Sequence, residues 1–245
     1  MAYHLINAFL DKGISILQIL ARNERSGRAL SENFNIPCIT DPEKLNREAD
    51  LYILAVQDDQ IMAAAHSLKL RNQLLVHTSG YTPLEILSGS SANTGVIWPL
   101  QTLTEGREAD YHQIPVFVEG NTKENEEMLV DFMSLISNHV GITDSPTRRQ
   151  IHLAAVIASN LTNHLYTISA SLLEKADVPF DVLVPLINET AGKTRLQHPR
   201  FNQTGPAARK DFQVIEKHLE MLKDEPAYRE IYRLLTENII QHHSK

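Results

Sequence analysis

The chain has 245 residues, 42% of them hydrophobic, and a formal net charge of −7. This length accommodates one large domain or two modest ones, and the apolar content suffices for real cores. The acidic balance, without any cluster of Lys and Arg, argues against a surface that binds nucleic acid. The single cysteine, Cys38, rules out an internal disulfide and a cysteine-based zinc site, which fits a reducing cytoplasm. The first residues do not read as a signal peptide.

The first forty residues alternate between helical and strand patterns. Apolar residues at helical spacing predict a helix from Ala2 to Lys12, and Gly13 stands where a helix end favours a positive φ. Residues 14–20 form a β-branched and leucine-rich run, which predicts a buried strand. A helix over residues 24–34 and a short strand over residues 37–40 follow.

The same alternation continues to residue 143. Predicted strands cover residues 51–56, 73–77, 95–98, 115–119 and 139–143, and predicted helices cover residues 60–69 and 123–137. Alternating strands and helices predict an α/β fold with a mostly parallel sheet and right-handed crossovers. In such sheets ligands bind at the carboxyl ends of the strands, which here are Arg22-Asn23, residues 55–58 and residues 77–80.

The strand pattern stops at Ser145. Helical patterns then cover residues 145–175, 179–191, 207–223 and 227–242, with a turn-rich stretch before residue 207. We therefore predict two domains, an α/β domain of residues 1–144 and an all-α domain of residues 145–245.

The predicted helix of residues 145–175 carries the most unusual chemistry. One stripe of it is apolar, and the opposite arc is polar but uncharged, comprising His152, Ser159, Asn160, Asn163 and Tyr166. A surface helix would place Lys and Glu on that arc. Both faces are therefore expected to be covered, and the arc either forms a buried network at a domain or subunit interface or meets a ligand. A membrane span is excluded because polar residues are too frequent in this run.

Several segments carry motifs that are specific when taken together. They are residues 51–59, residues 77–80, residues 98–102, residues 152–156 with Asn160, Asn163 and His164, and residues 203–207 with Arg209 and Asp211. Over nearly its whole length the chain thus resembles two-domain proteins that join a Rossmann-like NADP-binding domain to a helical C-terminal domain of uncharacterised function. These proteins are relatives of the deazaflavin-dependent NADP oxidoreductases, of pyrroline-5-carboxylate reductase and of prephenate dehydrogenase.

One departure from that family concerns the phosphate-binding turn. Family members begin with a strand and a Gly-x-Gly-x-x-Ala turn, which seats the pyrophosphate on the N-terminus of the next helix. This chain begins Met1-Ala2-Tyr3-His4, where that turn should be ending. Either the start is truncated or the usual first strand and cradle have been given up. We therefore expect NADP binding to be weak or lost in the chain as it stands.

The resemblance places the cofactor along the strand ends. Arg22 and Asn23 would meet the adenosine ribose, where an Arg suits the 2′-phosphate of NADP, and the alternative is a solvated Arg after a strand. Small or polar residues at the next strand ends would lie along the nicotinamide half of the cofactor: Ala55, Val56, Gln57, Thr78 and Ser79. The histidine spacings do not suggest a metal site.

The substrate is expected in a cleft between the two domains. Asn160 would orient the substrate or the nicotinamide, Lys193 is the best candidate acid, and His152 or His77 would relay a proton. Further substrate-binding groups would come from Asn163, Gln203, Thr204 and Arg209, the last as a partner of a carboxylate. The alternative for the turn at residues 203–206 is a plain helix-capping loop.

Two function classes follow from these observations. The first is an NADP-dependent oxidoreductase that transfers a hydride between the nicotinamide and an unknown small polar substrate. The second is a non-catalytic dimeric scaffold or ligand sensor that has lost cofactor binding, and the fold alone does not choose between them. We further expect a homodimer formed through the helical domain, a cytoplasmic location, and neither nucleic acid nor membrane as a partner.

Overall fold

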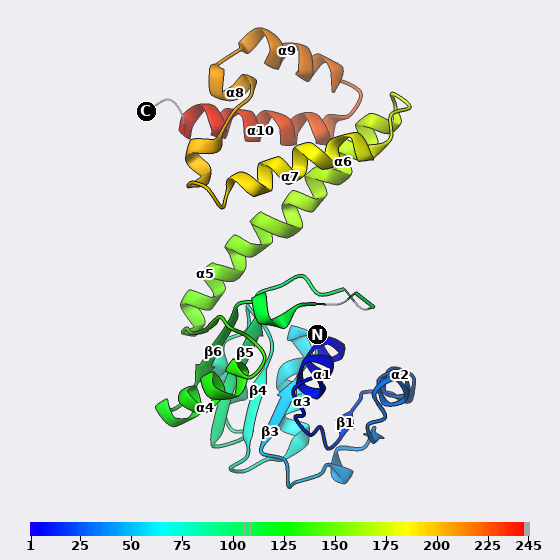
Figure 1. Cartoon of the computed structure of the whole chain (residues 1–245), viewed down its shortest axis with the longest axis vertical. Coiled ribbons are helices and arrows are strands. Elements are labelled where there is room, and N and C mark those ends of the chain that lie inside the picture. The colour runs from blue at the N-terminus through cyan, green and yellow to red at the C-terminus, as the bar shows by residue number, and fades with distance from the viewer. Residues whose placement is uncertain (105, 108, 243–245) are drawn as a thin grey trace. The chain divides into compact units, whose positions relative to one another are not determined.

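The computed structural model describes residues 1–104, 106–107 and 109–242 (Figure 1). Contacts within the chain divide it into two units, Met1–Asn160 and Leu161–Lys245. The sequence predicted a boundary after residue 144, which is where the strands end and helix α5 begins. Helix α5 (Ser145–Ala155) nevertheless belongs to the first unit, because its side chains pack against the sheet. Among the described residues, no helix is long and apolar enough to cross a membrane.

The first unit opens with helix α1 (Ala2–Leu10), as predicted. Its buried face is formed by residues at helical spacing, such as Leu5 and Phe9, and Gly13 follows with φ 70°. The strand predicted for residues 14–20 is wrong in its length, since only β1 (Ile19–Leu20) pairs with a neighbour. Ile14 and Ile16 still pack against the core, but the partner strand β2 (Cys38–Ile39) offers a register of only two residues. Helix α2 (Glu24–Phe34) connects the two strands.

A separate five-stranded sheet has the order β3-β4-β5-β6-β7. Its strands are β3 (Leu51–Leu54), β4 (Leu74–His77), β5 (Asn93–Pro99), β6 (Val116–Gly120) and β7 (Val140–Ile142). All neighbours are parallel except β5 and β6, which are antiparallel. The described part of their connection contains a 3-10 turn, Tyr111–Gln113, instead of a crossover helix, so the chain returns beside β5 in the opposite direction.

Helices cover both faces of this sheet, as the α/β prediction required. Successive residues of the fully buried strand β4 point to opposite cores, Val76 to the one beneath α1 and Leu75 to the other. Helix α4 (Lys123–Ser134) also packs on the first core, and Thr122 caps its N-terminus by accepting from Asn125 N–H at 3.2 Å. Helix α3 (Ile61–Leu68) packs on the second.

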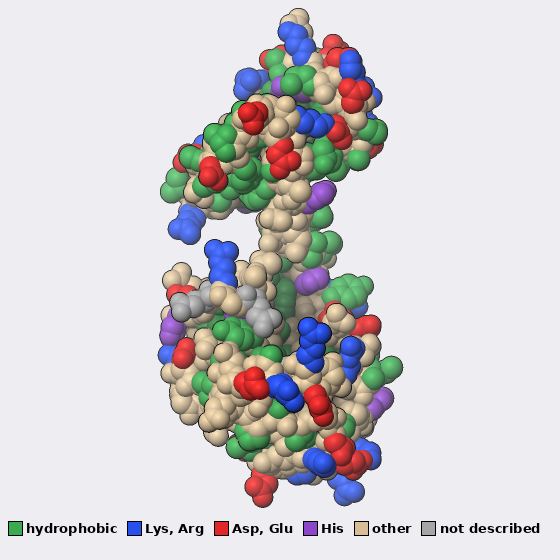
Figure 2. Space-filling view, turned by 90° about the vertical axis from the view of Figure 1, so that its right-hand side faces the viewer, with side chains coloured by type: hydrophobic (Ala, Val, Ile, Leu, Met, Phe, Trp, Pro, Cys, Tyr) green, Lys and Arg blue, Asp and Glu red, His purple; other side chains and the backbone are tan. Residues whose placement is uncertain are grey.

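The second unit is all-helical in its described part, as predicted. The predicted long helix is interrupted by a π-helical turn, Val156–Leu161, between α5 and α6. The remaining helices are α6 (Thr162–Glu174), α7 (Val184–Lys193), α8 (Pro206–Arg209), α9 (Phe212–Met221) and α10 (Pro226–His242). Hydrophobic side chains remain visible on the surface of this unit (Figure 2).

Candidate functional site

The candidate site starts at the carboxyl ends of β3 and β4, which lie side by side in register, with Leu54 opposite His77. The Ser79 hydroxyl makes three hydrogen bonds in the loop after β4. It donates to the Asp58 carboxylate at 2.8 Å and accepts from the N–H groups of Tyr81 and Thr82 at 3.1 and 2.9 Å. Because Asp58 follows β3, this serine ties the two strand ends together.

The neighbouring residues of this loop are equally constrained. Thr78 is buried, and both its backbone N–H and its hydroxyl donate to the Leu54 carbonyl, at 3.2 and 3.4 Å. The structure therefore brings together two groups of proposed cofactor residues, Thr78 with Ser79 and residues 55–57. In the second group, Val56 is exposed.

His77 is fully buried at the end of β4. Its Nδ1 accepts from the Ser79 N–H at 3.1 Å, so the neutral ring carries its proton on Nε2. The pKa of His77 is lowered to about 4, chiefly by burial and also by the positive charge of Arg148, while the Pro83 carbonyl and Asp58 oppose the shift. At neutral pH this imidazole is uncharged, which favours a positioning role for it over proton relay.

His152 lies in a different environment, beside aromatic rings. Its ring centroid is 5.9 Å from that of Trp98 and 6.3 Å from that of Tyr81. Gly80 permits this approach, since a Cβ there would lie 2.6 Å from Trp98 Cε2 and 2.7 Å from His152 Cδ2. Unlike His77, His152 is only half-buried. The structure thus gathers His77, residues 78–81 and His152 on one side of the sheet's carboxyl end.

A buried ion pair contacts the loop that follows β4. Arg148, on the first turns of α5, has no exposed surface and pairs with the Glu119 carboxylate of β6. Arg148 also donates to the Thr82 carbonyl at 2.6 Å. The sequence indicated Asp58 as part of a strand end and Trp98 as part of a motif, but it predicted no role for Glu119 or Arg148. No local pattern links Glu119 to Arg148.

The uncharged arc predicted on the helical run of residues 145–175 is partly exposed to solvent in the single chain. Ser159, Asn160 and Asn163 are exposed, and the Ser159 hydroxyl lies 3.2 Å from that of Thr102. Ser159 and Asn160 belong to the π-helical turn, an element that often marks functional sites. These groups are therefore available to a ligand or to a second chain.

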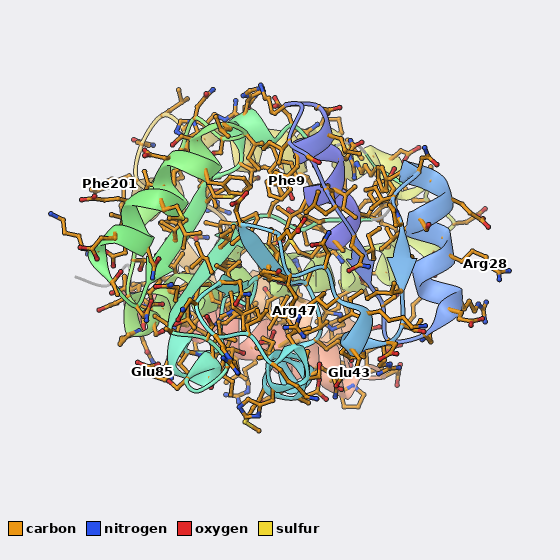
Figure 3. The ribbon with its side chains drawn as sticks, turned by 90° about the horizontal axis from the view of Figure 1, so that it is seen from below. Phe9, Arg28, Glu43, Arg47, Glu85 and Phe201 are labelled. Carbon is orange, nitrogen blue, oxygen red and sulfur yellow. The ribbon has the colours of Figure 1, made fainter. Side chains whose placement is uncertain are left out.

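Arg22 and Asn23 follow β1, and so they are carried by the small two-stranded sheet rather than by the main one. Both residues are exposed. Arg28, on the adjoining helix α2, projects outward (Figure 3). An exposed guanidinium at a strand's carboxyl end fits a 2′-phosphate, and the small or polar residues at the strand ends, 55–57 and 78–79, fit a dinucleotide.

The second unit carries the other predicted residues, Lys193, Gln203, Thr204 and Arg209. Lys193 ends α7 and pairs with Glu189 at 3.2 Å, and its carbonyl accepts from the Asn202 amide at 3.1 Å. Asn202 immediately precedes Gln203 and Thr204, which are exposed, and Arg209 is exposed at the end of α8. Among the residues that the structure describes, no group of three His, Cys, Asp or Glu could hold a metal ion.

Comparison with known proteins relates this geometry to a family. Residues 1–81 match the domain described as NADP oxidoreductase, coenzyme F420-dependent, and residues 114–239 match the domain of unknown function DUF2520. No curated protein matches the sequence.

Solved structures agree with these matches. A candidate NADP oxidoreductase from Bacteroides fragilis is 38% identical, with a TM-score of 0.90 over 98% of this chain and 94% of that one. An imine reductase from Myxococcus stipitatus in complex with NADP+ is 14% identical, with a TM-score of 0.64 over 98% and 90%. The 1-pyrroline-5-carboxylate reductase of Streptococcus pyogenes is 12% identical, with a TM-score of 0.62 over 99% and 95%, and shows likeness of fold alone. The chain therefore belongs to the DUF2520 family, in which an oxidoreductase-like NADP-binding fold is joined to a helical C-terminal domain.

Proposed function

We propose that the chain is an NADP-dependent oxidoreductase that acts on a small polar substrate. The observation that carries this proposal is the loop after β4, which Ser79 ties to Asp58 at the carboxyl end of β3. That edge is where open α/β sheets bind dinucleotides. All seven proposed cofactor residues, from Arg22 to Ser79, also fall within the segment that matches the oxidoreductase domain. This favours an enzyme over the alternative of a cofactor-free scaffold.

When bound, NADPH supplies the hydride, and the chain's residues would hold it in two places. Arg22 would pair with the 2′-phosphate and Asn23 with the ribose, both being exposed at the end of β1. Residues 55–57 and 78–79 would line the path of the cofactor toward its nicotinamide. The hydrogen bonds of Thr78 and Ser79 fix this wall before the cofactor arrives, which lowers the entropic cost of binding.

The substrate would need a proton and an orienting donor. His152 suits the first task better than His77, because His77 is fully buried and burial lowers its pKa to about 4. Lys193 remains the proposed acid from the helical domain. Asn160 would orient the reacting group, as a neutral amide donor can stabilise charge that develops there. Asn163, Gln203, Thr204 and Arg209 would bind the rest of a carboxylate-bearing substrate.

The cofactor assignment is tested by titrating NADPH and NADH and following their fluorescence. Arg22→Ala should raise the Kd for NADPH about 10- to 100-fold and leave that for NADH unchanged, because a charge-assisted contact to phosphate is lost. Arg71→Ala is the matched control, since Arg71 is an exposed arginine that precedes the amino end of β4. The same titration measures the absolute affinity, which the sequence predicts to be low. Failure of both nucleotides to bind would leave the scaffold interpretation.

The catalytic assignment is tested on Asn160. With 1-pyrroline-5-carboxylate as the probe, Asn160→Ala should reduce NADPH oxidation about 100- to 1000-fold, the usual effect of losing one transition-state donor. The melting temperature should not change, because Asn160 is exposed. Thr167→Ala, an exposed residue of α6, serves as the control. A large drop in melting temperature for Asn160→Ala would instead identify a structural network, and no turnover by the unaltered chain would reject this substrate class.

A further inference from the structure

The Arg148–Glu119 ion pair is the most deeply buried charged group outside the proposed cofactor and substrate residues. Arg148 has no exposed surface, and the Glu119 side chain is 11% exposed. Removing two charges from water is costly, and a buried ion pair is often no more stable than apolar side chains of the same size. Stability alone is therefore a poor reason for placing this pair in the core, and its contacts indicate another role.

The pair joins three segments that are distant in sequence. Arg148 donates from Nη2 to the Thr82 carbonyl at 2.6 Å and to the Ser145 hydroxyl at 3.2 Å. Ser145 in turn donates from its backbone N–H to Glu119 at 2.9 Å and accepts from the Leu84 N–H at 3.0 Å. Strand β6, the loop after β4 and the first turn of α5 are thus held by one connected set of hydrogen bonds.

This set of hydrogen bonds reaches the loop after β4, which carries the proposed cofactor residues. The loop that Arg148 holds at Thr82 is the loop whose Ser79 accepts from the Thr82 N–H at 2.9 Å. One helical turn beyond Arg148, on the same face of α5, His152 packs against Gly80 of that loop. Helix α5 therefore meets the loop twice, through a guanidinium at Thr82 and through an imidazole at Gly80.

We propose that Arg148, held by Glu119, is a positioning residue that sets His152 and the Thr78–Ser79 wall in one fixed arrangement. This inference rests on the proposed function, since it treats those residues as the place where cofactor and proton donor meet. Neither Arg148 nor Glu119 touches substrate in this role. Their charges fix direction and distance, because a guanidinium satisfies a carboxylate and a carbonyl only in one geometry.

The experiment replaces the pair without leaving a charge unpaired. The double variant Glu119→Leu/Arg148→Met keeps side-chain volume and should melt near the temperature of the unaltered protein. Trp98 is the only tryptophan of the chain and lies beside His152, so its fluorescence reports their contact without any assay of activity. Removing the imidazole with His152→Ala should therefore change the intensity and the emission maximum of Trp98, and this change defines the signal for loss of the contact.

In the double variant we expect the Trp98 emission to change as it does in His152→Ala, and the Kd for NADPH to rise at least tenfold. Unchanged Trp98 emission together with unchanged NADPH affinity would overturn the proposal and leave the pair a structural feature. If the unaltered protein binds no NADPH, the proposed function fails, while the Trp98 emission of the double variant still decides whether the pair positions His152. Should the double variant not fold, Ser145→Ala decides the question. This variant removes the Ser145 hydroxyl, which contacts both Glu119 and Arg148, and keeps both charges. It should change the Trp98 emission and the Kd for NADPH in the same direction as the double variant, but less.

Discussion

His77 shows how one buried residue couples the site to pH. Its ring is fully buried, and its Nδ1 is committed to the Ser79 N–H at 3.1 Å. Protonation would place a charge beside the Arg148 guanidinium and would break that hydrogen bond. These effects, burial first, explain why the pKa of His77 falls to about 4 in the folded chain.

We predict that the chain loses stability as acid is added, in a window set by His77. In the unfolded chain this histidine takes up a proton near its ordinary pKa of about 6.5, whereas in the folded chain it does so only near 4. The contribution of neutral His77 to the free energy of unfolding is therefore complete above about pH 6.5 and is lost as the pH falls to about 4. The difference corresponds to about 3 kcal/mol in the free energy of unfolding, measurable by urea denaturation at several pH values.

His77→Asn is the control for this prediction. Its amide oxygen can still accept from the Ser79 N–H, but the side chain does not titrate. Carboxylates elsewhere also titrate in this range, so the relevant quantity is the difference between the two proteins. Equal loss of stability in both on acidification would show that His77 is not the group responsible.

At the scale of one element, the helical run from Ser145 to Glu174 departs from its prediction in an informative way. Its amphipathic pattern was visible in the sequence, but its π-helical turn was not. A π-helical turn closes with i→i+5 hydrogen bonds, a choice that the hydrophobic pattern of the sequence does not reveal. In and beside this turn, Leu153, Ile157 and Leu161 are each more than half exposed, at 53%, 54% and 54%.

We predict that this face pairs with a second copy of the chain. Contiguous exposed apolar side chains beside an uncharged arc are typical of an interface between identical subunits. Leu161→Asp should therefore convert a dimer to a monomer in light scattering at micromolar concentration. Met128→Asp, which alters a residue 53% exposed on α4, should not. A monomer for the unaltered chain would contradict the prediction.

At the scale of the whole molecule, the alternation of strands and helices could be predicted from the sequence. Each element buries one face, so its apolar residues recur at the spacing typical of a helix or of a strand. The mostly parallel sheet is confirmed, but the sequence did not reveal which residues pair. Residues 14–18 are apolar enough for a strand but have only a two-residue partner, and β6 reverses direction because its connection lacks a crossover helix. Pairing depends on neighbours distant in sequence, and so does the Glu119–Arg148 contact, which no local pattern reveals.

The separation of β1 and β2 from the main sheet bears on the energetics of any ligand that Arg22 holds. The β1–α2–β2 segment makes its ladder through bonds such as Ile19 N–H to the Pro37 carbonyl and Ala21 N–H to the Ile39 carbonyl, both 2.9 Å. It can therefore open locally without breaking any strand pair of the five-stranded sheet. If a phosphate binds only to the segment in its ordered form, its apparent affinity is lower than its intrinsic affinity. The apparent affinity falls in proportion to the fraction of molecules in which the segment is ordered. Replacements that stiffen this segment, far from any ligand atom, would then tighten binding.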